Sequence, residues 1–354
     1  MKYLFIVQGE GRGHLTQALA TRELLAREGH EVTGMLVGKA RAAVLPAFFV
    51  ERAGCPVETF DSVYFLFSRA GRRALFFKTI LHHACRAFRY IKSVSFIRHR
   101  VAASGADAVI NFYEVIAGVT FALSRPRLPV YCVAHQYLFL HPGFVFPAGC
   151  RWLELRSLLF FTRLTGARAT RLLALSFREM PAAGRLRVIP PRLRREVTRM
   201  ETGDDGFILG YLLDAGFAGQ VIDWHRRHPG VPLHFFWNKP GAPRETTVDD
   251  TLTFHQLDGV TFLRRMARCR GYASTGGFES VCEAMYARKP VMMVPAHVEQ
   301  ECNAFDAARA GAGIVSRDFN LSALLDYIPR HAGNEAFIAW ADRADELLLE
   351  GLTR

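Results

Sequence analysis

Short apolar runs alternate with stretches of helical periodicity from the start of the chain. Residues 3–8 are mostly apolar, residues 9–13 are rich in glycine, and apolar side chains then recur at helical spacing over residues 14–27. A second apolar run follows at residues 31–37. The pattern predicts a strand, a glycine-rich turn, a helix and a second strand parallel to the first, joined by a right-handed crossover.

The same alternation continues to residue 189. Further strands are expected at residues 106–112, 129–134, 171–175 and 186–189, and helices at residues 78–101, 115–123 and 152–164. Pro190 and Pro191 end this run, and residues 192–206 are rich in charge and poor in apolar side chains. We therefore expect a first domain at residues 1–191 and a linker at residues 192–206.

After the linker the alternation begins again. Strands are expected at residues 207–213, 232–237, 251–255, 271–274, 290–294 and 313–315, and a polar loop at residues 239–250. Helices are expected at residues 217–227, 260–267, 279–287, 300–310, 321–328 and 335–349. The fold class is therefore α/β, with two Rossmann-like doubly wound domains facing across a cleft. The second domain covers residues 207–354, and its last helix is expected to pack back on the first domain.

Charge narrows the classes of partner. The chain has 354 residues, enough for two ordinary cores, and a formal net charge of +12, which favours acidic or phosphate-bearing partners. No nucleic-acid-binding motif is recognisable, so nucleic acid is not expected as a partner. Of the two basic clusters, the one at residues 185–199 is interpreted as a solvated surface.

Cysteines and apolar segments indicate the compartment. The seven cysteines include no C-x-x-C pair, which fits a reducing environment better than a disulfide framework. The first apolar run is too short for a signal peptide, and no stretch approaches the roughly 20 apolar residues of a membrane span. We expect a cytoplasmic protein.

A strand-to-helix turn in the second domain carries the strongest candidate chemistry. Ser274, Thr275, Gly276 and Gly277 stand where a strand ends and a helix begins. Glycines leave backbone N–H groups uncovered, and a helix N-terminus adds partial positive charge, so the turn suits a diphosphate. Ser280 and, one helical turn later, Glu283 lie on that helix, where a carboxylate can accept hydrogen bonds from ribose hydroxyls.

These residues resemble the donor-binding signature of glycosyltransferase family 1 and of the peptidoglycan N-acetylglucosaminyltransferase family. The matching positions, in order, are Gly276-Gly277, Glu283, Lys289-Pro290, Pro295 and Glu299-Gln300. The resemblance implies the GT-B fold, a ribose held by Glu283, and sugar hydroxyls held by Glu299 and Gln300. Family 1 usually has His where Thr275 stands, so that phosphate contact is weakened or replaced by the Thr hydroxyl. The alternative, a plain tight turn with Glu279 and Glu283 in solvent, does not account for five features in order.

The opening loop of the first domain has the sequence Gly9-Glu10-Gly11-Arg12-Gly13-His14. Alone this pattern is weak, because glycine-rich first loops are common. It resembles the G-x-G-H loop of the same transferases, and most closely a bacterial and archaeal branch with G-x-G-R-G-H. Histidine suits a general base because its pKa lies near neutrality. His14 is the candidate base; a phosphate-binding or helix-capping His stays open.

Three further residues of the first domain are candidates. Family 1 enzymes often orient the catalytic His with an Asp, and the matching place here holds Asn111, with Glu114 nearby as a substitute. An ordinary Glu at a helix N-terminus stays open for Glu114. His135 ends another strand on the same side and is a candidate contact for acceptor or donor sugar, with a buried, hydrogen-bonded His as the alternative.

Together these features predict an inverting hexosyltransferase that uses a UDP-sugar and a small-molecule or lipid-linked acceptor. No Asp-x-Asp triplet is present, so neither a metal nor another cofactor is expected. Two alternatives stay open. One is a nucleotide-sugar hydrolase of the pseudaminic acid pathway type, in which water replaces the acceptor. The other is a nucleotide-sugar-binding protein without catalysis.

The second basic cluster, residues 69–100, mixes aromatic and aliphatic side chains with cations and contains no acidic residue. Such a helix suits the surface of an anionic membrane. The peptidoglycan enzyme that the chain resembles reaches a lipid-linked acceptor through an apolar patch ringed by basic residues. Peripheral attachment to the inner face of the membrane is therefore one interpretation. The other is a helix that packs on the sheet with its basic face in water.

Overall fold

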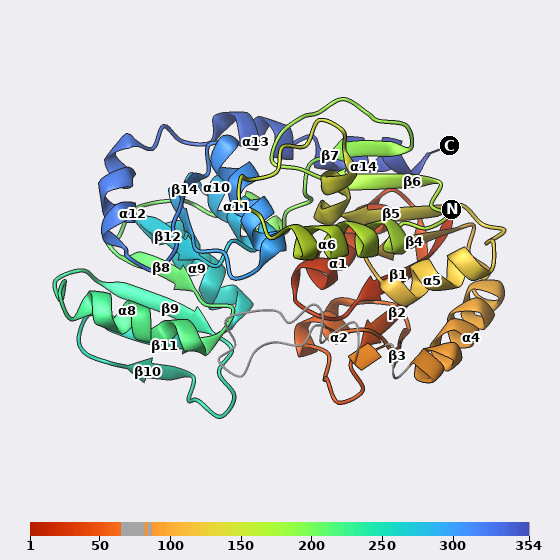
Figure 1. Cartoon of the computed structure of the whole chain (residues 1–354), viewed down its shortest axis with the longest axis horizontal. Helices are drawn as coiled ribbons and strands as arrows, with labels where there is room; N and C mark the ends of the chain where they lie inside the picture. The colour runs from red at the N-terminus through yellow and green to blue at the C-terminus, as the bar shows by residue number, and fades with distance from the viewer. Residues whose placement is uncertain (65–81, 84–86, 354) are drawn as a thin grey trace.

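The computed structural model describes residues 1–64, 82–83 and 87–353 (Figure 1). The described chain forms two α/β lobes, each built on a seven-stranded sheet. Residues 69–81 and 84–86 of the basic segment lie outside the described residues. Most of the part of the predicted helix at residues 78–101 that precedes Ala87 therefore lies outside them as well.

The first sheet is parallel throughout, in the order β3-β2-β1-β4-β5-β6-β7. Its strands are β1 (Lys2–Gln8), β2 (Glu31–Lys39), β3 (Val57–Asp61), β4 (Ala108–Phe112), β5 (Val130–Ala134), β6 (Arg171–Leu175) and β7 (Leu186–Ile189). The helices are α1 (Gly13–Arg27), α2 (Ala47–Arg52), α4 (Ala87–Ala103), α5 (Val115–Leu123) and α6 (Trp152–Thr165), with a 3-10 turn η1 (His135–Leu140). The central strands β4 and β5 are fully buried, as strands covered by helices on both faces must be.

The second sheet has the order β10-β11-β9-β8-β12-β13-β14, and β10 pairs antiparallel with β11. Its strands are β8 (Ile208–Tyr211), β9 (Leu233–Trp237), β10 (Glu245–Thr247), β11 (Leu252–Gln256), β12 (Gly271–Ser274), β13 (Val291–Met293) and β14 (Gly313–Val315). The helices are η2 (Ala215–Phe217), α8 (Ala218–His225), α9 (Gly259–Arg268), α10 (Phe278–Tyr286), α11 (Val298–Arg309), α12 (Ser322–Tyr327), η3 (Ile328–Arg330) and α13 (Glu335–Ala341). Two doubly wound α/β domains, the predicted fold class, are confirmed.

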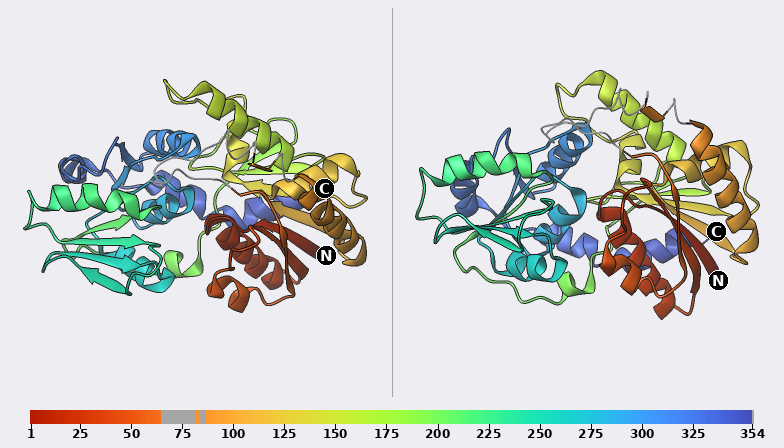
Figure 2. Two further views of the ribbon diagram at one scale, coloured as in Figure 1. Left: turned by 60° about the horizontal axis from the view of Figure 1, so that its bottom comes forward. Right: turned by 90° about the horizontal axis from the view of Figure 1, so that it is seen from below.

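The C-terminal helix crosses to the other lobe. The expected helix at residues 335–349 is two helices, α13 and α14 (Ala344–Leu352). Helix α13 packs on α10 of the second domain, whereas α14 packs on β6 and β7 of the first. Figure 2 shows this crossing from two directions. The break lets each half of the segment bury its apolar side against a different domain.

The connection between the domains is not simply solvated. It contains a short helix, α7 (Arg195–Thr198), and Arg192 is only 6% exposed. The Arg192 guanidinium donates to Ala20 O (2.6 Å) and to Asp345 (2.6 Å). The interpretation of residues 185–199 as a solvated surface is therefore wrong for Arg192, because its side chain is buried between acceptors on α1 and α14.

A short edge strand also departs from the pattern. Strand β10 lies inside the segment expected to be a polar loop, and it pairs with β11 at Glu245 and His255. Its sequence, Glu-Thr-Thr, has no apolar alternation that could reveal a strand.

Candidate functional site

The two lobes meet around one large cleft. A cavity of about 990 Å³ is lined by the loop after β1, the turn after β5, the start of α10 after β12 and the start of α11 after β13. All four segments follow the carboxyl ends of parallel strands, where open α/β sheets bind their ligands.

The glycine loop forms the first-domain wall of this cavity. Gly11, Arg12 and Gly13 line it, whereas Gly9 packs against the backbone of β2 at Gly38. A side chain at residue 13 would meet the second domain at once, since a Cβ there would lie 3.0 Å from Glu279 Cγ. The loop is therefore glycine-rich in part because the two domains approach each other closely here.

His14 lies in the first turn of α1 and lines the cavity. Its ring stacks on Tyr113, with centroids 5.4 Å apart and planes inclined by 20°. Tyr113 has a left-handed backbone conformation, with φ of 60°, and its hydroxyl is 2.7 Å from Thr162 Oγ1. Burial lowers the pKa of His14 to about 4, so the imidazole is neutral near pH 7 and can accept a proton.

Asn111 and Glu114 have other partners. Asn111 is fully buried and donates to the carbonyls of Glu114 (3.1 Å) and Thr165 (3.0 Å). Glu114 caps α5 by accepting from Ala117 N (2.6 Å) and also accepts from Ser62 Oγ. Within the described residues no hydrogen bond joins His14 to either side chain, and neither lines the cavity. This geometry does not support either residue as the partner that orients His14.

The turn after β12 leads directly into α10. Ser274 is fully buried and accepts from Gly276 N at 3.1 Å, so it holds the turn together instead of lining the cavity. Gly276 adopts φ of 78°, which favours glycine. Thr275 and Gly277 line the cavity, and the N-terminus of α10 carries no side-chain cap. The backbone N–H groups there remain available to an anion.

The remaining predicted donor residues gather on the same wall. Ser280, Glu283, Glu299 and Gln300 all line the cavity. Glu283 is 3% exposed and pairs with Arg194. The side-chain Oε1 of Gln300 accepts from Ala296 N at 2.9 Å, which shapes the loop before α11. The interpretation of Glu283 as a solvent-facing carboxylate is excluded.

Three contacts connect the domains across the cleft. Gln17 donates to Glu279 (2.8 Å), and Gln136 donates to Glu299 (2.9 Å). The ring of His135 stacks on Phe278 at the start of α10, with centroids 3.9 Å apart. His135 also shares a hydrogen bond of 2.7 Å with Leu175 O through Nδ1, which leaves Nε2 as the acceptor nitrogen of the neutral ring.

Among the described residues, five buried polar atoms of side chains that line the cavity have no hydrogen-bonding partner of good geometry. They are Gln8 Oε1, His135 Nε2, Gln136 Oε1, Thr275 Oγ1 and Asn303 Oδ1. Four of the five can only accept hydrogen bonds when the His ring is neutral. Buried polar groups are nearly always paired, so this part of the cavity suits a ligand that donates several hydrogen bonds.

Burial raises the pKa values of three carboxyl groups that line the cleft. It raises the pKa of Glu279 to about 8 and that of Glu299 to about 7. Burial also raises the pKa of Glu283, against the opposing effect of Arg194. Near neutral pH, Glu279 in the first turn of α10 is therefore largely uncharged and can donate a hydrogen bond.

Sequence reasoning missed several residues of this site. Tyr113, Arg194, Glu279 and Asn303 all line the cavity. Asn303 lies one turn beyond Glu299 and Gln300 on α11, a spacing that could have revealed it. The others lacked a local signal, because their place in the site depends on contacts between distant segments.

The family profile of glycosyl transferase family 1 matches residues 1–331. The chain belongs to glycosyl transferase family 1. The prediction that the protein is a glycosyltransferase is thereby confirmed. No match was found among curated protein sequences.

Solved glycosyltransferases share the fold of this family 1 member over nearly its whole length. The glycotransferase of kitacinnamycin has a TM-score of 0.62 at 16% identity and covers 99% of this chain and 95% of its own. MurG of Acinetobacter baumannii has a TM-score of 0.56 at 15% identity, covering 99% of each chain. Phytolacca americana UGT2, solved with UDP-2-fluoro-glucose and pterostilbene, has a TM-score of 0.63 at 13% identity, covering 99% and 98%. The GT-B fold is confirmed.

Among the described residues, no three His, Cys, Asp or Glu side chains gather in an arrangement that could hold a metal ion. Nor does any described helix combine the length and apolar character of a membrane span.

Proposed function

We propose that the cleft binds a nucleoside diphosphate sugar, with UDP as the nucleotide, and transfers the sugar to an acceptor hydroxyl with inversion. The observation that carries the proposal is the group of unpartnered polar atoms on His135, Gln136, Thr275 and Asn303, together with the uncapped N-terminus of α10. A nucleotide-sugar satisfies both features, because its hydroxyl groups can donate to the unpartnered atoms and its diphosphate can bind at the N-terminus of α10.

The diphosphate is proposed to lie at the start of α10. Gly277 leaves open space around its backbone, and Thr275 offers an unpartnered hydroxyl. The partial positive charge of the helix N-terminus favours an anion there. Arg12 on the glycine loop lines the same cavity and adds a full positive charge from the first domain. These groups do the work that a divalent cation does in other transferases, so the proposed reaction needs no metal.

The sugar is proposed to lie between α11 and the turn after β5. Glu299 and Gln300 come from α11, and Gln136 and His135 approach from the first domain. Gln136 Oε1 and His135 Nε2 are unpartnered acceptors, which match the O–H groups of a hexose. His14, neutral near pH 7, is the proposed base that removes the proton of the acceptor hydroxyl.

Replacing Glu283 with alanine tests the donor assignment. Loss of a hydrogen bond to a charged group costs roughly 1.5–3 kcal/mol, so UDP affinity should fall about ten-fold or more. Titration calorimetry with UDP, TDP and GDP measures this effect and the choice of nucleotide. Glu346→Ala, which removes an exposed carboxylate on α14, is the matched control and should bind like the wild type. Equal UDP affinity in a folded Glu283→Ala protein would contradict the placement of the ribose.

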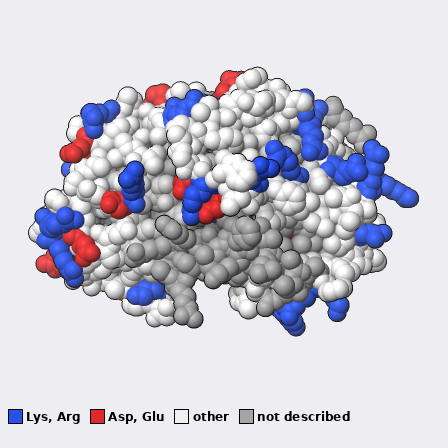
Figure 3. Space-filling model, viewed as in Figure 1, with Lys and Arg blue, Asp and Glu red and all other residues white. Residues whose placement is uncertain are grey.

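The acceptor is proposed to be reached at a membrane surface through α4. Of the basic segment at 69–100, α4 is described, and on it Phe88 (85% exposed) and Ile91 (60% exposed) stand beside exposed Arg89 and Lys92. Among the charged side chains that Figure 3 shows over the first domain, most are Lys or Arg. Exposed apolar residues among cations suit peripheral contact with anionic lipid.

Vesicle sedimentation tests this contact. The wild type should bind vesicles that contain anionic lipid and should be released by salt, because cations supply part of the attraction. The double variant Phe88→Ser/Ile91→Ser should bind at least about a hundred-fold less, since each apolar side chain contributes about 1.5–3 kcal/mol when buried and every 1.4 kcal/mol is a factor of about ten. Val44→Ser, at another exposed apolar position (90% exposed), is the control. No sedimentation of the wild type at low salt would point to a soluble acceptor.

A further inference from the structure

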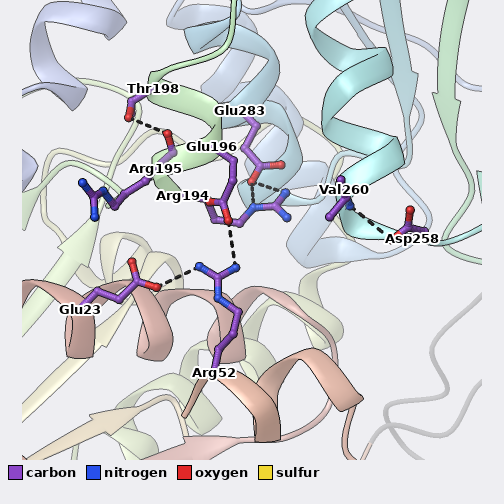
Figure 4. A network of polar contacts seen from close by, with 9 residues as sticks. All are labelled: Glu23, Arg52, Arg194, Arg195, Glu196, Thr198, Asp258, Val260 and Glu283. Atoms are coloured by element: carbon purple, nitrogen blue, oxygen red, sulfur yellow. Dashed lines mark hydrogen bonds and ion pairs between the residues drawn. The ribbon is translucent and has the colours of Figure 1, made fainter. Parts of the chain in front are cut away.

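Arg194 reaches from the interdomain linker into the second domain. Its guanidinium bonds the carboxylate of Glu283 through Nε (2.7 Å) and Nη2 (2.6 Å), as Figure 4 shows. The side chain of Arg194 is 22% exposed and that of Glu283 is 4% exposed. This is a well-buried ion pair at the cavity wall, since both residues line the cavity.

The Arg194–Glu283 ion pair uses one of the two carboxylate oxygens. Both guanidinium nitrogens contact the same oxygen, Glu283 Oε1. A carboxylate has about four lone-pair sites on two oxygens, so Arg194 fixes the group and leaves Oε2 for other donors. An arginine that bridged both oxygens would compete with a ligand for the carboxylate.

The charges around Glu283 explain why it needs this partner. Burial raises its pKa, Arg194 lowers it, and Glu196 on α7 raises it again. The charge of Glu283 in turn raises the pKa values of Glu279, Tyr272 and Cys282. Arg194 is the cation that lowers the pKa of Glu283 against burial and Glu196.

The first domain holds the linker turn that carries Arg194. Glu196, two residues on, pairs with Arg52 of α2 (3.2 Å), which also pairs with Glu23 of α1 (2.9 Å). Figure 4 shows these side chains in one network with the linker. Arg194 therefore projects from a segment anchored to the opposite domain.

We propose that Arg194 is the positioning residue for the donor ribose: it holds Glu283 by Oε1 and leaves Oε2 to accept the ribose hydroxyls. The inference rests on the proposed function, because it assumes that the ribose lies on Glu283. It assigns a specific task to the linker, which supplies from outside the second domain the partner that the ribose-binding carboxylate requires.

The test compares UDP with 2′-deoxy-UDP, which differ only in one ribose hydroxyl. In the wild type the ratio of their dissociation constants should be roughly ten or more, the worth of one hydrogen bond to a carboxylate. In Arg194→Gln the ratio should fall to about two or less, because Glu283 loses its fixed orientation and charge. Arg194→Lys keeps the charge without the planar fork and should restore part of the ratio.

Arg195→Gln is the matched control, since Arg195 is the exposed neighbour in the same turn. It should keep the wild-type ratio, and thermal unfolding should show that each variant is folded. If Arg194→Gln weakens both ligands equally and keeps their ratio, Arg194 binds phosphate and the inference is overturned. A wild-type ratio near one would place the ribose elsewhere. Absence of UDP binding to the wild type would overturn the proposed function and this inference together.

Discussion

Replacing His14 with alanine is expected to lower turnover by about 10²–10⁴-fold while donor affinity stays within roughly two-fold. A general base acts in the transition state, so its removal affects the rate far more than the binding of substrate. The measurement is initial-rate kinetics in the presence of a chelator, combined with calorimetry of UDP binding. His99→Ala, which removes an exposed His on α4, should leave both quantities unchanged.

The pH dependence of the rate gives a second readout for His14. The active form of a base is the neutral one, and burial holds the pKa of His14 at about 4. The rate should therefore not fall as pH drops through about 6.5, the region where an exposed His would take up a proton. If His14→Ala instead abolishes UDP binding and spares the rate of each bound complex, His14 is a phosphate ligand. Release of free sugar without acceptor, at the same rate as transfer, would favour the hydrolase.

Replacing Glu279 with glutamine is expected to remove an alkaline loss of donor affinity. Glu279 lies in the first turn of α10, and its pKa is raised by burial to about 8. Below that pH the protonated group can donate to a phosphate oxygen. Above it a negative charge appears beside the diphosphate, so wild-type UDP affinity should fall on the order of ten-fold between about pH 7 and about pH 9. Glu279→Gln should bind UDP with little change over this range.

The free energy of unfolding should also depend on the titration of the Glu279 carboxyl group. The pKa of Glu279 lies above the 4.5 of the free side chain, so its contribution to stability is complete below that value. The contribution is lost as pH rises through about 8, and Glu279→Gln should therefore unfold at a higher temperature than the wild type under alkaline conditions. Glu346→Gln, an exposed change on α14, controls for the loss of one charge. An unchanged pH profile of UDP binding in Glu279→Gln would separate Glu279 from the diphosphate.

Local pattern was sufficient for the architecture where the chain obeys one periodicity. The alternation of apolar runs and helical spacing led to both sheets, because central parallel strands are buried on both faces and must be apolar. The pattern failed at β10, whose polar edge strand has no buried face to reveal it. It also missed the break between α13 and α14, which exists because the segment crosses from one domain to the other.

The site divides in the same way. The motif residues from Gly276 to Gln300 belong to two successive strand-to-helix units, β12–α10 and β13–α11. Because β12 and β13 are neighbours in the sheet, the order of these residues in the sequence is also their order along one sheet edge. By itself, the sequence indicated two α/β domains, the glycine loop with His14, and the residues of the second domain that line the cavity. Only the tertiary structure decided the rest: Tyr113, not Asn111 or Glu114, contacts His14. It also decided that Arg194 reaches Glu283 from the linker. Such contacts join segments that are distant in the chain. The charged side chains are buried only when the domains meet, and only then does burial decide which partner each one needs.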